Sequence, residues 1–522
     1  MKRILLIISG GIFLIIVTLL GLSFVENLMN LNNTSGPAIS ITPEPIEEPV
    51  ILVQGIYDGE DPLTDEELKE IQDLEIRNVE DFEFLKEQTQ LINLSVSEEY
   101  FSTVKGDISD LSELVDLKVI DLRNANISGD ISAFEKLVNL EYIDIAFYVP
   151  GMDSASGGNI LTMMTSMMNG MMDAMLSIAE PPKKVKGNTA VLAGMENLVY
   201  VDLSMSEVEG KLADISQLTN LKHVNFYSLK VIGDIAELEA LNNLEHISLG
   251  YAPSSYDEQN ELVGNLSSLS NLSNLKYIAI LYSGIIGDLS DISGLTELET
   301  ITIVGASIGG NLSSLENLKN LKVISVLLQM ENGIKGDISS FEGLKNIEVI
   351  TFMMNMSCKD ITGDIKALSG CTNLKAANFS TCNVSGDLSS LSNLSELESL
   401  DLSKAFYEKE NSITGELLDL LPLKKLKFLT IAYSDVIGTM EDLQSMDRLT
   451  SIMIGESPIT GDISKLANLE NLESLMLANM EVKGDVSSLE GLEKLTLVTI
   501  QETDVTGSLT LPSGMEIDLD SE

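Results

Sequence analysis

Tryptophan is absent from the 522 residues, and the chain has only two histidines and three cysteines. Two histidines argue against a histidine-rich metal centre or a histidine-based hydrolytic site. The cysteines, Cys358, Cys371 and Cys382, are too few for a disulfide-stapled scaffold and lack the spacing of a zinc site. These absences favour a protein that binds other molecules without a metal, a cofactor or an enzymatic reaction.

Positive charge is also scarce. Lys and Arg number 32 against 80 Asp and Glu, which gives a formal net charge of −48. Nucleic-acid binding needs Lys and Arg to neutralise phosphates, so this balance excludes a DNA- or RNA-binding role. Hydrophobic residues nevertheless make up 44% of the chain, which is enough for a large core and is unlike the composition of disordered proteins.

The amino terminus carries a long apolar run. Lys2 and Arg3 precede an uncharged stretch from Ile4 to Val25, which is long enough as a helix to cross a bilayer. We expect residues 1–25 to be a signal-anchor in the membrane or, if the chain is cleaved near Ser23, a signal peptide. Because the positive residues stay inside, the rest of the chain is predicted to lie outside the cytoplasm, at the cell surface or secreted.

Two segments follow before the main repeat begins. Residues 26–60 are rich in proline and acidic residues, and we interpret them as an extended spacer. Residues 61–103 are predicted to form an N-terminal cap, which opens with a capped amphipathic helix from Pro62 to Ile71.

A glycine recurs at nearly constant spacing along the rest of the chain. Ten of the fifteen intervals between these glycines are 23 residues and the other five are longer, so one period carries five insertions. The glycines are Gly106, Gly129, Gly187, Gly210, Gly233, Gly264, Gly287, Gly310, Gly336, Gly363, Gly386, Gly415, Gly438, Gly461, Gly484 and Gly507.

The leucines within one unit indicate its local structure. Leu466, Leu469, Leu472, Leu475 and Leu477 are spaced by three residues and finally by two. The spacing of three predicts a helical or 3₁₀ arc, and the final spacing of two predicts a short strand. A single unit cannot bury its leucines, so the units must stack with their strands parallel along one side. The predicted fold class is therefore an α/β-type repeat solenoid.

These residues resemble the leucine-rich repeat family, and the run from Ile459 to Leu477 is similar to the units of bacterial internalin-like surface proteins. The resemblance implies a horseshoe with short parallel strands on its concave face and irregular or 3₁₀ turns on its convex face. The solenoid is predicted over 104–517, with a Met-rich insertion at 149–185 and a tail at 518–522. The asparagine that usually follows the strand in such units is mostly missing from this chain.

Outward side chains on the predicted concave strands are the candidate ligand-binding residues. Five consecutive strands carry a ring at the first outward position, and the next outward position begins with acidic residues. Such a surface suits a protein ligand that carries Lys or Arg. The alternative is that the rings stack across the strands and stabilise the sheet. The predicted residues are Tyr142, Tyr200, His223, His246 and Tyr277, with Asp121, Asp144, Asp202 and Tyr227.

The Met-rich insertion is a second candidate for partner binding. Its methionines follow i, i+4 spacing, among them Met164, Met168 and Met172, which predicts an amphipathic helix. Methionine suits a surface that re-packs against varied partners. The alternative is that this helix lies on the solenoid and buries its methionines.

Three smaller features leave alternatives open. Nine repeats carry Asp directly after the glycine, and we expect these carboxylates to accept hydrogen bonds from turn N–H groups, with weak Ca²⁺ binding as the alternative. The two histidines are predicted to lie near Asp202, but we predict no metal there. Cys358 and Cys382 lie in adjacent repeats, where they form either a disulfide or two free thiols.

The sequence therefore favours an extracellular, non-catalytic binding protein that adheres to or recognises a protein ligand through its concave face and insertion-bearing edge. A self-associating surface-coat protein is the alternative, and a secreted enzyme or the accessory subunit of one is least favoured. A fold of this kind hosts many functions, so adhesion rests on the family resemblance alone.

Overall fold

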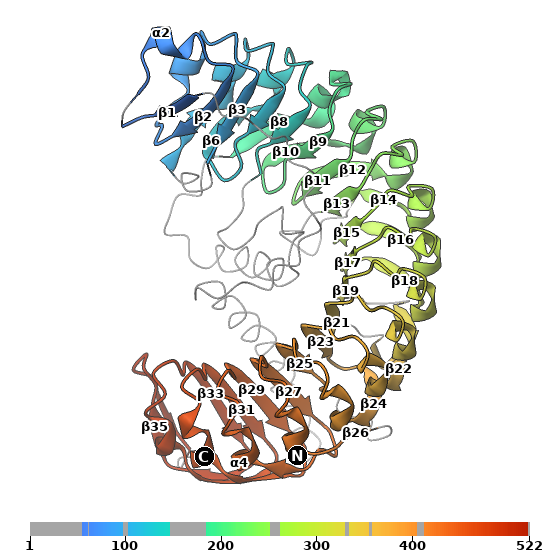
Figure 1. Cartoon of the computed structure of the whole chain (residues 1–522), viewed down its shortest axis with the longest axis vertical. Coiled ribbons are helices and arrows are strands. Elements are labelled where there is room, and N and C mark those ends of the chain that lie inside the picture. The colour runs from blue at the N-terminus through green and yellow to red at the C-terminus, as the bar shows by residue number, and fades with distance from the viewer. Residues whose placement is uncertain are drawn as a thin grey trace, which may run out of the picture.

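The computed structural model describes residues 55–60, 62–97, 103–146, 184–250, 261–328, 333–353, 358–404 and 412–519. They form an open, curved stack in which one coil of chain follows another from end to end (Figure 1). The apolar segment 1–25 and almost all of the Met-rich insertion, with Met164, Met168 and Met172, lie outside the described residues. No helix in the described part is long and apolar enough to cross a membrane.

Parallel strands line the inner side of the curve, one from each coil (Figure 1). The sheet begins at β1, which lies in the segment predicted to be a spacer, so that prediction is wrong for the end of the segment, where Gly55–Asp58 pair with β2. The segment predicted to be an N-terminal cap supplies β2 and β3. Its strands are β1 (Gly55–Asp58), β2 (Asp73–Arg77), β3 (Asn93–Val96), β5 (Val119–Asp121), β7 (Tyr142–Asp144), β9 (Tyr200–Asp202), β11 (His223–Tyr227), β13 (His246–Gly250), β15 (Tyr277–Leu281), β17 (Thr300–Val304), β19 (Val323–Leu327), β21 (Val349–Met353), β23 (Ala376–Phe379), β25 (Ser399–Asp401), β27 (Phe428–Ala432), β29 (Ser451–Gly455), β31 (Ser474–Ala478) and β33 (Leu497–Gln501).

A second set of short parallel strands contains most of the repeated glycines and leads into the turns on the outer side of the curve (Figure 1), whereas Gly415 and Gly507 directly follow their strands. These strands are β4 (Lys105–Asp107), β6 (Asn126–Asp130), β8 (Val185–Asn188), β10 (Glu207–Lys211), β12 (Lys230–Asp234), β14 (Leu262–Asn265), β16 (Gly284–Asp288), β18 (Ser307–Asn311), β20 (Ile334–Asp337), β22 (Ile361–Asp364), β24 (Asn383–Asp387), β26 (Ile413–Thr414), β28 (Gly438–Thr439), β30 (Ile459–Asp462), β32 (Glu481–Asp485) and β34 (Asp504–Thr506).

Short helical turns follow these strands, as the spacing of three residues predicted. Most are 3₁₀ helices of four residues, and one is a single α-helical turn. They are η4 (Ile108–Leu111), η5 (Ile131–Phe134), η6 (Thr189–Gly194), η7 (Leu212–Ile215), η8 (Ile235–Leu238), η9 (Leu266–Leu269), η10 (Leu289–Ile292), η11 (Leu312–Leu315), η12 (Ile338–Phe341), η14 (Ile365–Leu368), η15 (Leu388–Leu391), η16 (Leu417–Leu420), α4 (Met440–Leu443), η17 (Ile463–Asn468) and η18 (Val486–Leu489), with η2 (Glu83–Leu85) in an earlier coil.

The two ends of the stack are closed differently. Near the N-terminal end, α2 (Asp65–Leu68) is shorter than the predicted helix, but Thr64 and Glu67 form a complete capping box at its start. At the other end, β35 (Ser508–Thr510) and β36 (Glu516–Asp518) pair as an antiparallel hairpin. Leu509 of this hairpin is buried, so the hairpin helps to cover the last coil.

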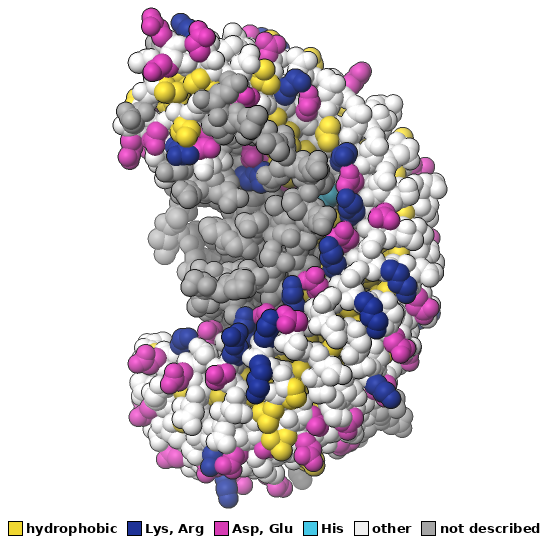
Figure 2. Space-filling model, in the orientation of Figure 1, with side chains coloured by type: hydrophobic (Ala, Val, Ile, Leu, Met, Phe, Trp, Pro, Cys, Tyr) yellow, Lys and Arg dark blue, Asp and Glu magenta, His cyan; other side chains and the backbone are white. Residues whose placement is uncertain are grey.

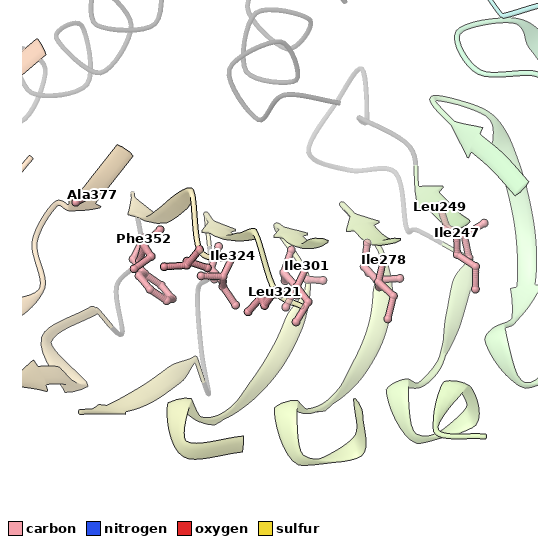
Figure 3. Close-up of a cluster of buried hydrophobic side chains, with 14 of the residues drawn as sticks. Ile247, Leu249, Ile278, Ile301, Leu321, Ile324, Phe352 and Ala377 are labelled. Carbon is pink, nitrogen blue, oxygen red and sulfur yellow. The ribbon is translucent and has the colours of Figure 1, made fainter. Parts of the chain in front are cut away.

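The core is one continuous column of apolar side chains, most of them aliphatic. Leu466, Leu469, Leu472, Leu475 and Leu477 are each at most 1% exposed, which confirms the predicted inward direction of these leucines. Figure 3 shows the same packing for isoleucines of successive inner strands, where Ile247, Ile278, Ile301 and Ile324 lie side by side in one row. Burying one leucine fully contributes about 1.5–3 kcal/mol, so the stack is stabilised mainly by contacts between repeats.

The glycine and the residue after it shape each turn. Gly129 has a φ of +120°, and a Cβ at this position would lie 2.6 Å from Oδ1 of Asp107 in the preceding repeat. Only glycine therefore leaves room for the neighbouring carboxylate. Asp107 in turn accepts a hydrogen bond from the N–H of Ser109 at 2.9 Å.

Equivalent caps recur along the stack, and they confirm the predicted role of the aspartates. Among the described residues, no three His, Cys, Asp or Glu side chains are placed to hold a metal ion, so the Ca²⁺ alternative has no support there. The capping residues are Asp107, Asp130, Asn188, Asp234, Asn265, Asp288, Asn311, Asp337, Asp364, Asp387, Asp462 and Asp485.

An asparagine ladder is present, but at a different position from the one that the sequence analysis considered. It lies in the turn before the inner strand, where the Asn220 side-chain amide donates to the backbone carbonyl of Glu196 in the preceding repeat at 2.9 Å. These bonds join one coil to the next. The donors are Asn139, Asn220, Asn243, Asn274, Asn320, Asn346, Asn373 and Asn471.

Lysine and glutamate alternate at the position just before the inner strand, and we call these residues the rim row. Charged side chains of both signs alternate along the inner rim of the curve (Figure 2). Ion pairs join neighbouring members at 2.6–3.3 Å, and Glu245 pairs with a lysine on each side. Like charges at this spacing would repel, so alternation stabilises the register. The rim row consists of Lys222, Glu245, Lys276, Glu299, Lys322, Glu348, Lys375, Glu398 and Lys427.

A disulfide joins Cys358 to Cys382, which decides between the two alternatives left by the sequence. Cys358 begins η13 (Cys358–Asp360), and Cys382 follows β23. Both side chains are buried, as is the free Cys371. The bond therefore ties one insertion-bearing segment to the next coil.

Replacing Lys322 by Glu tests the rim row, because it would place a third carboxylate between Glu299 and Glu348. We expect the free energy of unfolding to fall by about 1 kcal/mol more than in Lys322→Gln, and the difference to shrink at high salt. Chemical denaturation at two salt concentrations measures both effects. Equal stability of the two variants would contradict the role of alternation.

Removing the disulfide by Cys358→Ser and Cys382→Ser should lower the free energy of unfolding by about 3 kcal/mol, because the bond closes a loop with a sequence separation of 24. Thiol titration of the denatured wild-type protein provides the control. It should detect one thiol before reduction and three after it. Three thiols without reductant would show that the bond is not formed.

Candidate functional site

Five rings stack face to face across consecutive inner strands, and we call them the ring ladder: Tyr142, Tyr200, His223, His246 and Tyr277. Adjacent ring centroids lie 4.0–4.1 Å apart. The rings come together because the parallel strands pair in register, with Tyr200 opposite His223 and His246 opposite Tyr277. The structure thus places all five predicted ladder residues in one continuous stack.

The ring ladder is buried. Its members are only 2–8% exposed, and Tyr277 is the least exposed of them. Close stacking covers the faces of each ring and adds to the stability of the sheet, which is the arrangement that the sheet-stacking alternative describes. Direct contact of these rings with a ligand remains a prediction.

An acidic row runs beside the ladder, as predicted. Asp144 and Asp202 are opposite each other on β7 and β9, and both are fully buried. Arg123 donates to the carboxylate of Asp121 at 2.8 Å and lies 3.6 Å from that of Asp144. Arg123 was not among the predicted site residues. Its position two residues after Asp121 nevertheless places it on the same side of the chain as Asp121.

Hydrogen bonds link the ladder to the acidic row. The Tyr200 hydroxyl donates to Asp144 at 3.3 Å, and Arg123 donates to the Tyr142 hydroxyl at 2.8 Å. The amide of Asn225 donates to Asp202 at 2.9 Å. Tyr142, Arg123, Asp121, Asp144 and Tyr200 therefore form one polar network beside the stacked rings, and Asp202 and Asn225 form a pair next to it.

Burial sets the ionisation of this network. Burial raises the pKa of Asp144 well above its usual value; Arg123 opposes this shift, and the carboxylates of Asp202 and Asp121 add to it. Burial lowers the pKa of His223, and the carboxylate of Asp202 opposes that shift. The Arg123 guanidinium therefore lies beside Asp121 and Asp144, and burial makes the Asp144 carboxyl harder to ionise.

Tyr227 lies apart from the stacked rings. It ends β11 and is half-buried, and its backbone N–H donates to the side chain of Asn225 at 3.1 Å. It marks the side of the solenoid where the inner strands end and the insertions begin.

A groove opens on that same side near the C-terminal end, and we call it the edge groove. Its volume is about 540 Å³, and turn residues of successive coils line it. Four of these are acidic: Glu456, Glu481, Glu502 and Asp504. Acidic residues that recur soon after consecutive inner strands are the one signal for this groove in the sequence, and only the stacking of the coils brings them around one hollow.

No family model and no curated protein matches the chain. Solved structures match its fold. A plant peptide hormone receptor, RGFR1 in complex with RGF2, gives a TM-score of 0.54 at 18% identity, over 87% of this chain and 73% of that one. The leucine-rich repeat protein LIC12759 of Leptospira interrogans gives 0.51 at 16% identity, over 85% and 100% of the two chains. An internalin, InlF of Listeria monocytogenes, gives 0.34 at 16% identity, over 91% and 94%, which is too low a TM-score to support an inference.

The parallel inner sheet, the stacked coils and these matches show that the chain folds as a leucine-rich repeat solenoid, as its sequence resemblance predicted. Identities below 20% establish the fold alone.

Substituting Tyr200 distinguishes a supporting role from a ligand-contact role. Because the ring is buried between two others, we expect Tyr200→Ala to lower the free energy of unfolding by about 3 kcal/mol. Tyr200→Phe keeps the ring and loses only the hydrogen bond to Asp144, so it should cost about 1 kcal/mol. Denaturant unfolding measures both. An alanine variant as stable as the wild type would instead indicate a ring whose role is ligand contact.

Proposed function

We propose that this chain is an extracytoplasmic, non-catalytic binding protein that recognises a protein or peptide ligand through its concave face and insertion-bearing edge. The observation that carries this proposal is the open, rigidly stacked horseshoe with its continuous inner sheet (Figure 1). Such a scaffold holds edge loops in fixed positions, and loops on rigid scaffolds are where recognition residues concentrate. The plant receptor of the same fold is in complex with RGF2, which supports ligand binding as the general role.

The ligand is proposed to carry Lys or Arg. The chain has a formal net charge of −48, and the edge groove is lined by four acidic side chains. Complementary charge speeds association and discriminates against acidic partners. The ring ladder and acidic row would shape the concave face beside this edge, and Met164, Met168 and Met172 remain proposed partner contacts from their sequence pattern.

The compartment is proposed to be outside the cytoplasm. The disulfide between Cys358 and Cys382 supports this, because such bonds persist in oxidising compartments. Attachment through residues 1–25, or release by cleavage near Ser23, follows from the sequence pattern. Adhesion is the particular form of binding that the internalin-like repeats favour.

Binding of a Lys/Arg-rich decapeptide to the full chain tests the proposal. Reversing two groove charges by Glu456→Lys and Glu502→Lys should weaken binding at least about tenfold, which is about 1.4 kcal/mol. A matched variant with Glu239→Lys and Glu297→Lys changes net charge equally outside the groove and should bind like the wild type. Isothermal calorimetry measures all three proteins.

A Glu-rich decapeptide of the same length is the ligand control and should not bind. Equal weakening by both lysine variants would show that only overall charge matters, and it would contradict recognition at the edge groove. Concentration-dependent assembly of the wild type without any peptide would instead favour the surface-coat alternative.

A further inference from the structure

The only two histidines of the chain are neighbours at the centre of the ring ladder. Their rings stack at 4.0 Å, with Tyr200 against the other face of His223 and Tyr277 against the other face of His246. Histidine is the side chain whose ordinary pKa lies between pH 5 and 8. Both histidines of the chain, whose ordinary pKa lies near neutrality, are therefore part of one buried stack.

The groups that face His223 come from its own strand and from the strands on either side. On β9, Tyr200 covers one ring face, and a carboxylate oxygen of Asp202 lies 3.9 Å from Nε2. On β13, His246 covers the other ring face. On β11 itself, Asn225 and Tyr227 follow on the same side.

Farther along the acidic row, Asp144 and Arg123 complete the charged surroundings of His223. The Asp144 carboxylate adjoins Asp202 in register, and Arg123 lies 3.6 Å from Asp144. The Arg123 guanidinium acts against a positive charge on His223, whereas Asp202 favours it. The surroundings thus supply one nearby carboxylate, already engaged with Asn225.

Burial and Arg123 oppose a positive charge on His223, although Asp202 favours it, and burial also opposes a positive charge on His246. Nε2 of His223 is buried and has no hydrogen-bond partner in the described part of the chain. For His246, the charged group that acts on its ionisation is His223 itself. A proton on one ring therefore opposes a proton on the other, and each would bring a charge into a site shielded from water.

We propose that His223 and His246 form an acid-sensitive latch in the concave sheet: the two neutral rings complete the five-ring stack, and their protonation in mild acid loosens the sheet between β9 and β15. A shift of one protonated ring would affect its neighbours, because each ring packs face to face against the next. This latch is a property of the folded chain and does not depend on the proposed ligand.

The direction of the pH effect follows from the shifts. Burial lowers the pKa of both histidines below the ordinary value of 6.5. The unfolded chain then binds more protons than the folded chain below pH 6.5, so stability is full above that pH and falls as the pH drops beneath it.

Two buried aspartates work in the opposite direction. Burial raises the pKa of Asp401 to about 6 and that of Asp144 well above its usual value. Both therefore add stability as the pH falls through their raised pKa values. The measured pH dependence of stability is the sum of the histidine and aspartate contributions. The contribution of the histidines must therefore be obtained by comparing variants that differ only in the histidines.

Thermal unfolding of the full chain at pH 7.5 and 5.5 makes that comparison. The variant His223→Phe with His246→Phe keeps two stacked rings but cannot take up a proton there, and Tyr277→Phe is the matched control that retains both histidines. We expect the midpoint to fall on acidification by at least about 2 °C more in the wild type and Tyr277→Phe than in the double variant. The same fall in all three proteins would overturn the latch.

Should the double variant fail to fold, the wild type still decides the question. Labelling the histidine rings with ¹³C gives two signals, one for each histidine. Both should keep the shift of neutral imidazole at pH 6.5 and change only in more acidic solution, where both ring signals should also broaden. Two rings that titrate around pH 6.5 without any other spectral change would contradict the proposal.

Discussion

A coil of 23 residues has too little chain to enclose its own leucines, so each repeat is stable only against its neighbours. The rest of the structure follows from this constraint. The inner strands pair in parallel because successive coils lie in register, the aliphatic core runs from Leu68 to Leu511 as one cluster, and a hairpin closes the last coil. The disulfide and the asparagine ladder strengthen the same contacts between coils.

Stacking also places the same position of every repeat close to its counterparts, which is a difficulty for a chain with a net charge of −48. The repulsion between equivalent acidic positions of neighbouring repeats is reduced in a different way at each position of the repeat. After the glycine, each capping aspartate accepts a backbone N–H, as Asp462 does from Ser464. Before the inner strand, lysine alternates with glutamate. In the acidic row of the concave face, Arg123 lies beside Asp144, and burial raises the pKa of Asp144 and so disfavours a second negative charge next to Asp202. Other carboxylates, such as those that line the edge groove, lie on the turns and edges of the solenoid.

The concave face combines a rigid, buried stack of rings with a polar network that holds few positive charges. The stacked rings join five consecutive inner strands, whereas the edge groove is lined by residues that follow the inner strands, among them four acidic side chains and the buried Ser457 and Met480. The residues that stabilise the sheet and the residues that are proposed to contact a ligand thus lie in different parts of this fold. The ring ladder shapes the face, and the edge offers the accessible chemistry from which a binding role is proposed.

The sequence by itself determined the period, the inward direction of Leu466 and Leu477, the parallel inner strands and the capping role of the aspartates, because each depends on residues close together within one repeat. It also placed the five ring residues in one row. The burial of those rings, the ion pairs of Arg123, the disulfide and the edge groove were decided only by the tertiary structure. These features depend on how far one coil is shifted and turned against the next, and many small contacts along the whole stack set that geometry.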